Sequence, residues 1–183
     1  MKRIGPIKHK PKLLPPFQSL VQAIIYQQLS TKAAGTILKR FLHLFKDDDF
    51  PEPAQVMEMD AATLRATGLS RGKTAYIIDT ARKSLLGEIP SLEECDHLTD
   101  ETIIERLITI KGVGRWTAEM FLIFNLGRPD VLPVHDLGIR RGYQIAYRKR
   151  KLPEPGKLQR IGLKWTPHRT TVALYLWRNV DSS

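Results

Sequence analysis

Two glycines separated by one valine, between two apolar segments, constrain the fold of this 183-residue chain more than any other feature. The apolar segment 107–110 leads into the sequence KGVG at positions 111–114, and an amphipathic run over residues 115–124 follows. Gly112 and Gly114 permit a positive φ and the close approach of a ligand to the backbone. The first N–H groups of the second helix point back at this turn, where they can bind an anion such as a phosphate. The pattern therefore predicts a site for a nucleic-acid backbone or, more simply, a tight turn between two packed helices.

The charge balance favours a polyanionic partner. The chain has 29 Lys and Arg residues against 19 Asp and Glu residues, a formal net charge of +10. Such an excess typically accompanies nucleic-acid binding, although it is also compatible with a solvated surface that has no partner. With 42% hydrophobic residues the chain can bury a core, as one compact domain or as two small lobes.

A single cysteine, Cys95, excludes an internal disulfide and a four-cysteine iron–sulfur cluster. Residues 1–16 are basic and rich in proline, so we expect an arm over the domain and not a secretory signal. No apolar run approaches the length needed to span a membrane. We therefore expect a protein of the compartment that holds DNA, which is the cytoplasm with its nucleoid in a prokaryote and the nucleus in a eukaryote.

Apolar residues recur with helical spacing along most of the chain, and no segment alternates with a period of two. The start and stop signals predict an all-α protein of about eight to ten helices. In the first half we expect a helix over 17–29, a second helix capped by Ser30, two short helical pieces after the loop 47–53, and a helix from the turn 67–73 to Leu86. A loop over 88–98 should follow, and then a helix capped by Thr99 or Asp100. In the last part we expect a helix over 137–146 and a final helix that starts at Thr166 and Pro167.

Asp136 is the candidate for chemistry. It follows Pro133 and precedes an apolar run, so it suits the N-cap of a helix. A carboxylate beside a DNA-binding hairpin can also stabilise a sugar cation or orient a water molecule, and the two roles are compatible. A metal pair of His135 and Asp136 is disfavoured because no second cluster lies at ligand spacing.

Four segments together carry a resemblance to a known family. The sequence LITIKGVGRWTAEMFLIF (107–124), followed by DVLPVHDLGIRRG (130–142), resembles the helix–hairpin–helix DNA glycosylases (the HhH-GPD superfamily), most closely the 3-methyladenine DNA glycosylase II group. The segments LVQAIIYQQLSTKAAGTILKRF (20–41) and KWTPHRTTVALYLW (164–177) are similar to the early helix pair and the last helix of that group. The resemblance covers roughly residues 17–178. It implies an all-α fold of two helical lobes with the active site between them, in a single domain over 1–183 without an added N-terminal β domain.

The resemblance also implies an activity. Members of the group flip alkylated purines out of duplex DNA and hydrolyse the N-glycosidic bond, which leaves an abasic site. Relatives that also cleave the strand carry a lysine at the position of Trp116, so we expect base removal alone. The alternatives are a non-enzymatic helix–hairpin–helix DNA-binding module, and a glycosylase/lyase for oxidised bases. We expect a monomer that binds damaged double-stranded DNA and requires no cofactor.

The resemblance assigns roles residue by residue, although each has a plainer alternative. Trp116 and Trp177 could simply pack in the core, and the bend at Gln27 and Gln28 could be an ordinary surface turn. Two positions also depart from the family pattern: Gln28 stands where the family often has leucine, and Met120 stands where relatives can carry tyrosine. The implied catalytic residue is Asp136, and the implied base pocket consists of Trp116, Trp177, Met120 and Tyr26. The implied contacts to the DNA backbone are Lys111, Gly112, Gly114 and Thr117, and the implied minor-groove wedge is Gln28 or Leu29. The resemblance also implies a possible structural Na⁺ or K⁺ on the main-chain carbonyls of Ile108, Ile110 and Val113.

Overall fold

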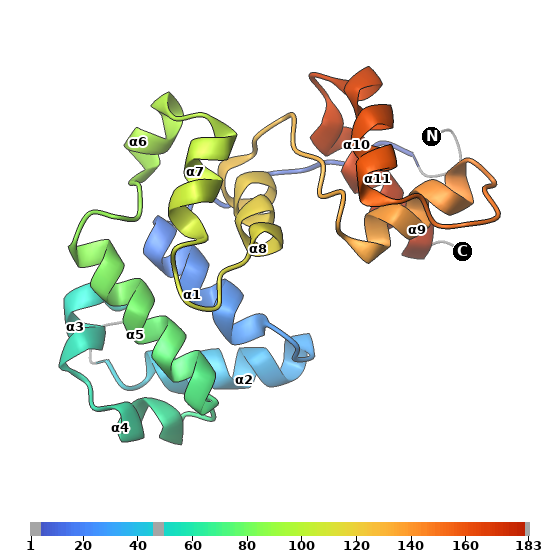
Figure 1. The fold of residues 1–183 in the computed structure, drawn as a ribbon. Helices are drawn as coiled ribbons and strands as arrows, with labels where there is room; N and C mark the ends of the chain where they lie inside the picture. Colours follow the sequence, from blue (N-terminus) through green and yellow to red (C-terminus); the bar gives the residue numbers. More distant parts are fainter. Residues whose placement is uncertain (1–4, 46–49, 182–183) are drawn as a thin grey trace. The chain divides into compact units, whose positions relative to one another are not determined.

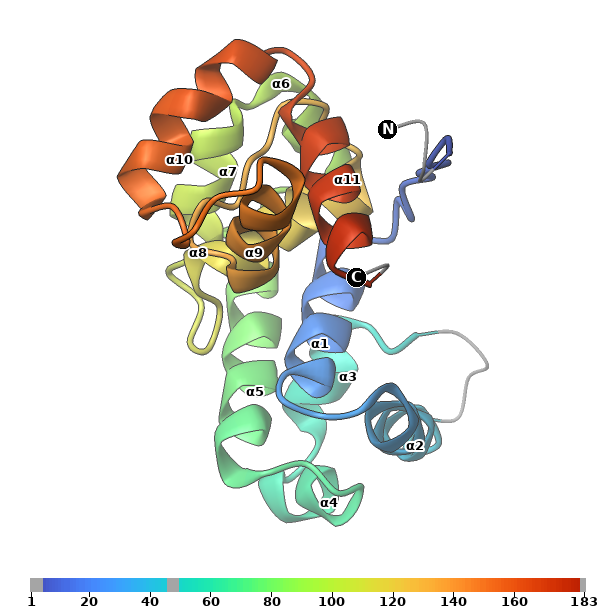
Figure 2. The same ribbon diagram turned by 90° about the vertical axis from the view of Figure 1, so that its right-hand side faces the viewer.

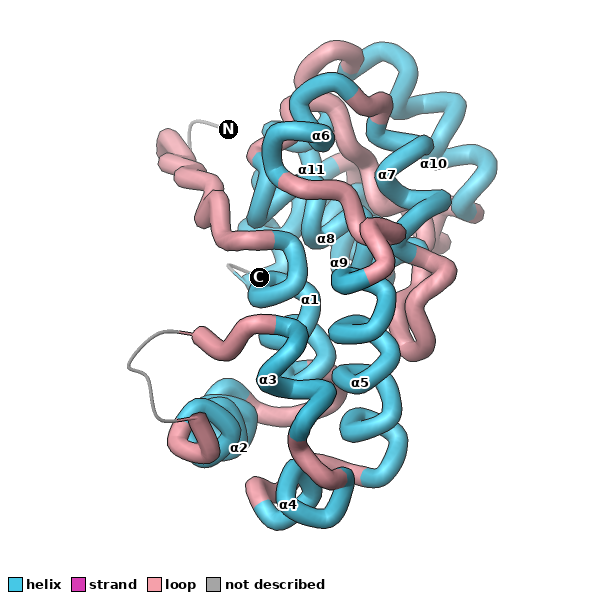
Figure 3. The backbone as a smooth tube through the Cα atoms, turned by 90° about the vertical axis from the view of Figure 1, so that its left-hand side faces the viewer, coloured by secondary structure: helices cyan, strands magenta, loops and turns pink. Residues whose placement is uncertain are grey.

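The computed structural model describes residues 5–45 and 50–181. Residues 1–4 of the expected arm and residues 47–49 of the expected acidic loop lie outside this range. Within the described range all regular structure is helical, and Figure 3 shows helices and loops but no strand. The all-α prediction is confirmed, with eleven α-helices in these residues where eight to ten were expected.

The chain divides into two compact units (Figure 1). Unit 2 is continuous and covers Leu13–Ala118, whereas unit 1 combines Met1–Lys12 with Glu119–Ser183. The boundary falls inside one helix, α8 (Arg115–Met120).

Unit 2 is built around α1 and α5, which pack side by side (Figure 2). In α1 the residues Leu20, Val21, Ile24 and Ile25 are buried, at the spacing that places them on one face of a helix. This apolar face forms the middle of the unit. The helices of unit 2 are α1 (Pro16–Tyr26), α2 (Thr31–Leu42), α3 (Pro53–Glu58), α4 (Ala61–Ala66), α5 (Arg71–Leu85), α6 (Leu92–His97) and α7 (Asp100–Leu107).

Side-chain caps explain where these helices begin. The side chains of Ser30, Asp60, Ser70, Ser91 and Thr99 each accept a hydrogen bond from a backbone N–H in the first turn of the helix that follows. Such caps satisfy donors that have no partner inside the helix. The cap at Ser30 was predicted, and Thr99 was one of the two caps predicted for α7, the other being Asp100. The loop predicted over 88–98 was wrong, because Ser91 forms a capping box that starts α6.

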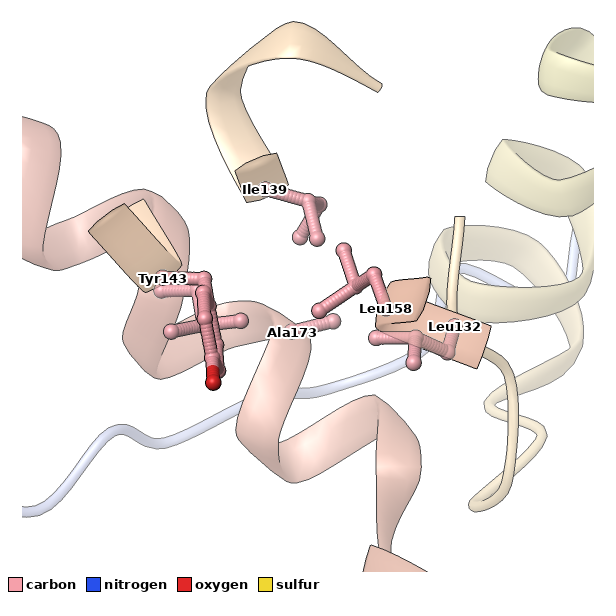
Figure 4. Packing of buried hydrophobic residues seen from close by; sticks show 6 residues of the cluster. Leu132, Ile139, Tyr143, Leu158 and Ala173 are labelled. Atoms are coloured by element: carbon pink, nitrogen blue, oxygen red, sulfur yellow. The ribbon is translucent and has the colours of Figure 1, made fainter. Parts of the chain in front are cut away.

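Unit 1 packs its last helix against the helix that follows Asp136 (Figure 1). Figure 4 shows the core around them, in which Ile139 and Tyr143 of α9 lie beside Leu132, Leu158 of α10 and Ala173 of α11. The elements of unit 1 are the end of α8, the π-helix η1 (Phe121–Leu126) that continues it, α9 (Leu137–Ala146), α10 (Pro155–Gly162), the 3-10 helix η2 (Leu163–Trp165) and α11 (Arg169–Asp181).

Gly142 lets α9 and α11 approach closely. A β-carbon at this position would lie 2.1 Å from the backbone oxygen of Leu176, a distance that no side chain tolerates. The glycine therefore sets the spacing between the two helices.

The predicted start of the last helix was wrong. Thr166 ends η2 through its N–H bond to Leu163, and α11 begins three residues later at Arg169. The backbone N–H of Arg169 donates to the carboxylate of Asp130, which its guanidinium also contacts at 2.7 Å. A residue distant in sequence therefore supplies the acceptor at this helix start.

Residues 5–12 of the arm pack on the rest of unit 1. The Nε2 atom of His9 donates to the Ile123 carbonyl oxygen at 2.8 Å, and the N–H of Lys12 donates to the Phe124 carbonyl at 3.0 Å. The hydroxyl of Tyr175 donates to the carbonyl of Gly5 at 3.1 Å. The arm thus contacts both η1 and α11.

Candidate functional site

The hairpin between α7 and α8 is formed as the glycine pattern predicts. After α7 the N–H of Ile110 donates to Leu107 and the N–H of Val113 donates to Ile110, each at 3.1 Å. Gly112 has a φ of +80°, in the left-handed region that favours glycine. The carbonyl of Gly114 accepts the first bond of α8, from Ala118. The segment is therefore a helix, a tight turn and a second helix.

Glycine serves a different physical purpose at each of the two positions. A β-carbon at Gly112 would lie 2.1 Å from a ring carbon of Tyr76, so both the backbone angle and the packing require glycine there. A β-carbon at Gly114 would meet nothing within 4 Å. Gly112 therefore builds the turn, while Gly114 leaves an open approach to its backbone.

Two side chains from elsewhere in unit 2 hold the hairpin in place. The carboxylate of Asp79 is buried and accepts the N–H of Lys111 at 2.9 Å and the guanidinium of Arg82 at 2.7 Å. Burial alone would raise the pKa of Asp79, but the Lys111 amide and the Arg82 guanidinium outweigh it, so this pKa lies below its usual value. The side-chain amide of Gln27 donates to the carbonyl of Gly112 at 2.9 Å. Asp79 was not predicted, although an acid within the apolar run IIDTA is a signal of a buried, paired carboxylate.

The bend after α1 is exposed and tied to the same hairpin through Gln27. Gln28 has a φ of +54°, and the side chains of Tyr26 and Leu29 are 37% and 41% exposed. The ammonium group of Lys73 donates to the carbonyls of Ile25 and Gln27 at 2.7 and 2.8 Å. These bonds give a partner to carbonyl groups at the C-terminal end of α1. Burial lowers the pKa of Lys73. The bend is therefore a braced element that presents an apolar side chain outward.

Asp136 is the N-cap of α9, as predicted. Its Oδ1 atom accepts the N–H of Ile139 at 2.7 Å and the indole N–H of Trp177 at 2.9 Å. A β-carbon at Gly138 would lie 2.9 Å from the Trp177 ring and 3.0 Å from Asp136 Oδ1. Gly138 therefore leaves the space in which the carboxylate and the indole meet. Asp136 and Trp177, which were predicted separately, are brought together within unit 1.

An aromatic row continues from this pair. The ring of Trp177 stacks on Phe124 with centroids 5.8 Å apart, and His9 meets the Phe124 ring edge-on at 5.5 Å. Phe124 is 37% exposed although it lies in η1 between buried neighbours. Neither Phe124 nor His9 was predicted, because the two ring contacts cross 53 and 115 positions of the chain.

The other predicted residues fall in both units. Trp116 is 49% exposed in the first turn of α8, which excludes the core-packing alternative for this residue. The side chain of Thr117 is buried, so only its backbone is available to a ligand. Lys111 is exposed and Met120 is half-buried. Unit 1 holds Asp136, Trp177 and Met120, and unit 2 holds Tyr26, Gln28, Leu29, Lys111, Gly112, Gly114, Trp116 and Thr117.

The described part of the chain contains neither a candidate metal site nor a candidate membrane-spanning helix. No group of three or more His, Cys, Asp or Glu side chains is placed to hold a metal ion in residues 5–45 and 50–181. Within the same residues no helix combines the length and the apolar character needed to cross a membrane.

Comparison with known proteins identifies the family. Residues 21–168 match the model of the HhH-GPD superfamily of base excision DNA repair proteins. DNA-3-methyladenine glycosylase 1 of Schizosaccharomyces pombe is 41% identical over 163 residues, which span 89% of this chain and 72% of that protein.

Two solved structures have a similar fold. The 3-methyladenine DNA glycosylase of S. pombe, in complex with abasic DNA, has a TM-score of 0.84 at 38% identity and covers 97% of this chain and 89% of its own. The DNA-3-methyladenine glycosidase of Bacillus halodurans also has a TM-score of 0.84 at 38% identity, covering 94% and 78% of the two chains. With the glycine hairpin and the helix-capping aspartate in place, the chain belongs to the HhH-GPD superfamily of base excision DNA repair proteins.

Proposed function

We propose that this protein is a monofunctional DNA glycosylase of base excision repair that removes alkylated purines, of the 3-methyladenine and 7-methylguanine type, from duplex DNA. The observation that carries the proposal is the hydrogen bond between the indole of Trp177 and the carboxylate of Asp136. A non-enzymatic clamp has no use for a carboxylate that is fixed by the N–H at the edge of an indole ring. The relatives named above are 3-methyladenine glycosylases, which supports the same substrate class.

The chemistry follows from the charges of substrate and site. An enzyme that acts on a base within a duplex must first extrude it. An alkylated purine carries positive charge, which the face of a tryptophan such as Trp177 attracts. As the bond between C1′ and the base nitrogen breaks, its electron pair neutralises the base and positive charge grows on the sugar. The carboxylate of Asp136 stabilises that sugar cation and accepts a proton from the water that attacks C1′.

The hairpin and the bend after α1 hold the distorted DNA in this proposal. Backbone N–H groups around Gly112, Gly114 and Thr117 bind a phosphate, with Lys111 beside them. Leu29 fills the gap left by the flipped nucleotide, because it is the exposed apolar side chain of the bend, whereas the neighbouring Gln28 is polar. The protein acts as a monomer in the compartment that holds the DNA.

A monovalent cation at the hairpin is also part of the proposal. The main-chain carbonyls proposed as ligands belong to Ile108, Ile110 and Val113, which lie in one short turn. A carbonyl oxygen that accepts one hydrogen bond still has a second lone pair that can bind an ion. Na⁺ or K⁺ there would strengthen the phosphate site. We expect tighter DNA binding in KCl than in tetramethylammonium chloride at equal ionic strength, because the larger ion does not fit between carbonyls. Equal affinity in both salts would exclude the cation.

The decisive experiment is a panel of duplexes that each carry one lesion. We expect abasic sites from alkylated purines, in strands that stay unbroken until they are treated with alkali. Borohydride added during turnover should trap no covalent adduct, because no lysine stands at the position of Trp116. Binding without excision would favour the non-enzymatic module, and a trapped adduct would favour the glycosylase/lyase.

Gly114→Asp should weaken DNA binding while leaving the fold largely intact. The new side chain meets no protein atom within 4 Å of its β-carbon, but its carboxylate would occupy the place proposed for a phosphate. Gly114→Ala is the matched control, since it adds the β-carbon without the charge. Duplex titrations and circular dichroism measure the two effects, and native-like binding by the Asp variant would remove the hairpin from the interface.

A further inference from the structure

A basic loop follows α9, at the end of that helix opposite Asp136. We use this name for residues 148–151, in the sequence RKRK. The loop lines a hollow of about 770 Å³ together with Lys157 and Glu154. The proposed chemistry uses none of these residues.

The backbone of the basic loop is fixed by hydrogen bonds. The N–H of Lys149 donates to the carbonyl of Gln144 at 2.9 Å, and the Gln144 amide donates back to the carbonyl of Arg150 at 3.1 Å. The guanidinium of Arg140 donates to the carbonyl of Pro153 at 2.9 Å. Arg148 has a φ of +49°, a conformation that is rare for a residue other than glycine. The left-handed Arg148 and the Lys149 bond form the C-terminal cap of α9, so the capped helix end holds the start of the basic loop in one place.

The charges around the hollow are unbalanced. Lys149, Arg150, Lys151 and Lys157 face a single carboxylate, that of Glu154. In the part of the chain that the structure describes, none of these four cations takes part in an ion pair. Like charges held together repel one another, and a polyanion relieves that repulsion while releasing its own counterions.

The position of the basic loop selects the partner. It continues the helix whose N-cap is Asp136, and α9 has ten residues, which correspond to about 15 Å at 1.5 Å per residue. Duplex DNA rises about 3.4 Å per base pair, so a backbone contact within this distance of the lesion lies at most about four base pairs from it, whatever the direction of α9 on the duplex. We propose that the basic loop binds the phosphate backbone of the duplex within about four to five base pairs of the lesion. This inference rests on the proposed function, because it takes Asp136 to mark the lesion.

The first test removes two charges from the loop. In Lys149→Gln/Lys151→Gln the backbone hydrogen bonds of the loop remain possible. The slope of log affinity against log salt concentration should become shallower by roughly 0.9 for each phosphate that is no longer neutralised, or roughly 1.8 in total, with affinity at about 0.1 M salt falling roughly tenfold or more. The matched control is Arg160→Gln/Lys164→Gln, which removes two exposed charges elsewhere in unit 1 and should leave the slope unchanged.

The second test locates the binding position on the duplex. Duplexes with one central lesion analogue are shortened to two base pairs on one flank and then on the other. On the flank that the loop contacts, shortening should lower the affinity of the wild type to that of the loop variant. Shortening the opposite flank should leave the difference between the two proteins unchanged. Equal slopes for the loop and control variants, or a deficit that is independent of both flanks, would overturn the inference.

The outcomes separate this inference from the proposed function. Excision of alkylated purines by the wild type, combined with a loop variant that binds like the control, would leave the proposed function standing and reject binding of the flank by the loop. A wild-type protein that binds duplex through the loop but excises nothing would support the role of the loop and reject the enzyme. Thermal unfolding midpoints equal to that of the wild type show that each variant is folded.

Discussion

Asp136→Asn should lower the rate of base excision by roughly two to four orders of magnitude, which is what one preorganised charge or general base contributes. The substitution removes the negative charge that stabilises the sugar cation in the transition state. It keeps the shape of the side chain, and the amide oxygen of asparagine can still accept the N–H of Ile139 and the indole N–H of Trp177. The fold and the affinity for damaged duplex should therefore survive.

Single-turnover excision from an alkylated duplex, beside a binding titration of the same duplex, measures this separation. Asp60→Asn is the matched control, because Asp60 also caps a helix through its side chain, at α4 in the other unit. The control should excise at the wild-type rate. If the Asp136 variant did so as well, Asp136 would be a helix cap and no more.

Gly142→Ala should destabilise the protein although it replaces a glycine within a helix. By helix propensity alone the change would stabilise α9 by roughly 1 kcal/mol. The added β-carbon would lie 2.1 Å from the Leu176 carbonyl oxygen, and backbone cannot move aside as a flexible side chain does. Overpacking typically costs about 1–3 kcal/mol, and because the neighbour here is backbone we expect about 2–3 kcal/mol, which exceeds the gain in propensity by about 1–2 kcal/mol. We expect the thermal unfolding midpoint to fall by roughly 2–8 °C.

Gly156→Ala isolates the propensity effect. Gly156 lies in α10, and a β-carbon there meets nothing within 4 Å, so this variant should be as stable as the wild type or slightly more stable. The Gly142 variant should also excise more slowly, because the displaced α11 carries Trp177. An unfolding midpoint for Gly142→Ala that equals that of Gly156→Ala would show that the two helices separate without cost.

Local signals accounted for the parts of the fold that the sequence predicted correctly. Ser30, Thr99 and Asp136 cap helices through bonds to N–H groups three residues ahead, so each cap is visible in a short window of sequence. The glycine hairpin was equally visible, because the turn depends on Gly112 itself. The candidate catalytic aspartate could thus be placed at a helix N-terminus before its surroundings were known.

Contacts between distant segments account for most of the errors and omissions. The acceptor for α11 is Asp130, which lies 39 positions before Arg169, and the hairpin is braced by Gln27 across 85 positions. The conversion of the helix after Arg115 into a π-helix at Phe121 has no signal that the hydrophobic pattern could reveal. The position of Asp79 against the hairpin likewise depends on how α5 packs, and its partner Lys111 is 32 positions away.

The division of the chain into one continuous and one discontinuous unit has a consequence for its synthesis. Unit 2 is a single stretch, so a nascent chain contains all of it as soon as residue 118 has left the ribosome. Unit 1 needs residues 5–12 and also α11, and Asp136 meets its indole partner only after 41 further residues have been added. The emerging polypeptide must therefore keep its early arm available while the hairpin-bearing unit is already folding. During translation, the hairpin proposed to bind DNA would therefore form before the carboxylate and indole proposed to hydrolyse the glycosidic bond come together.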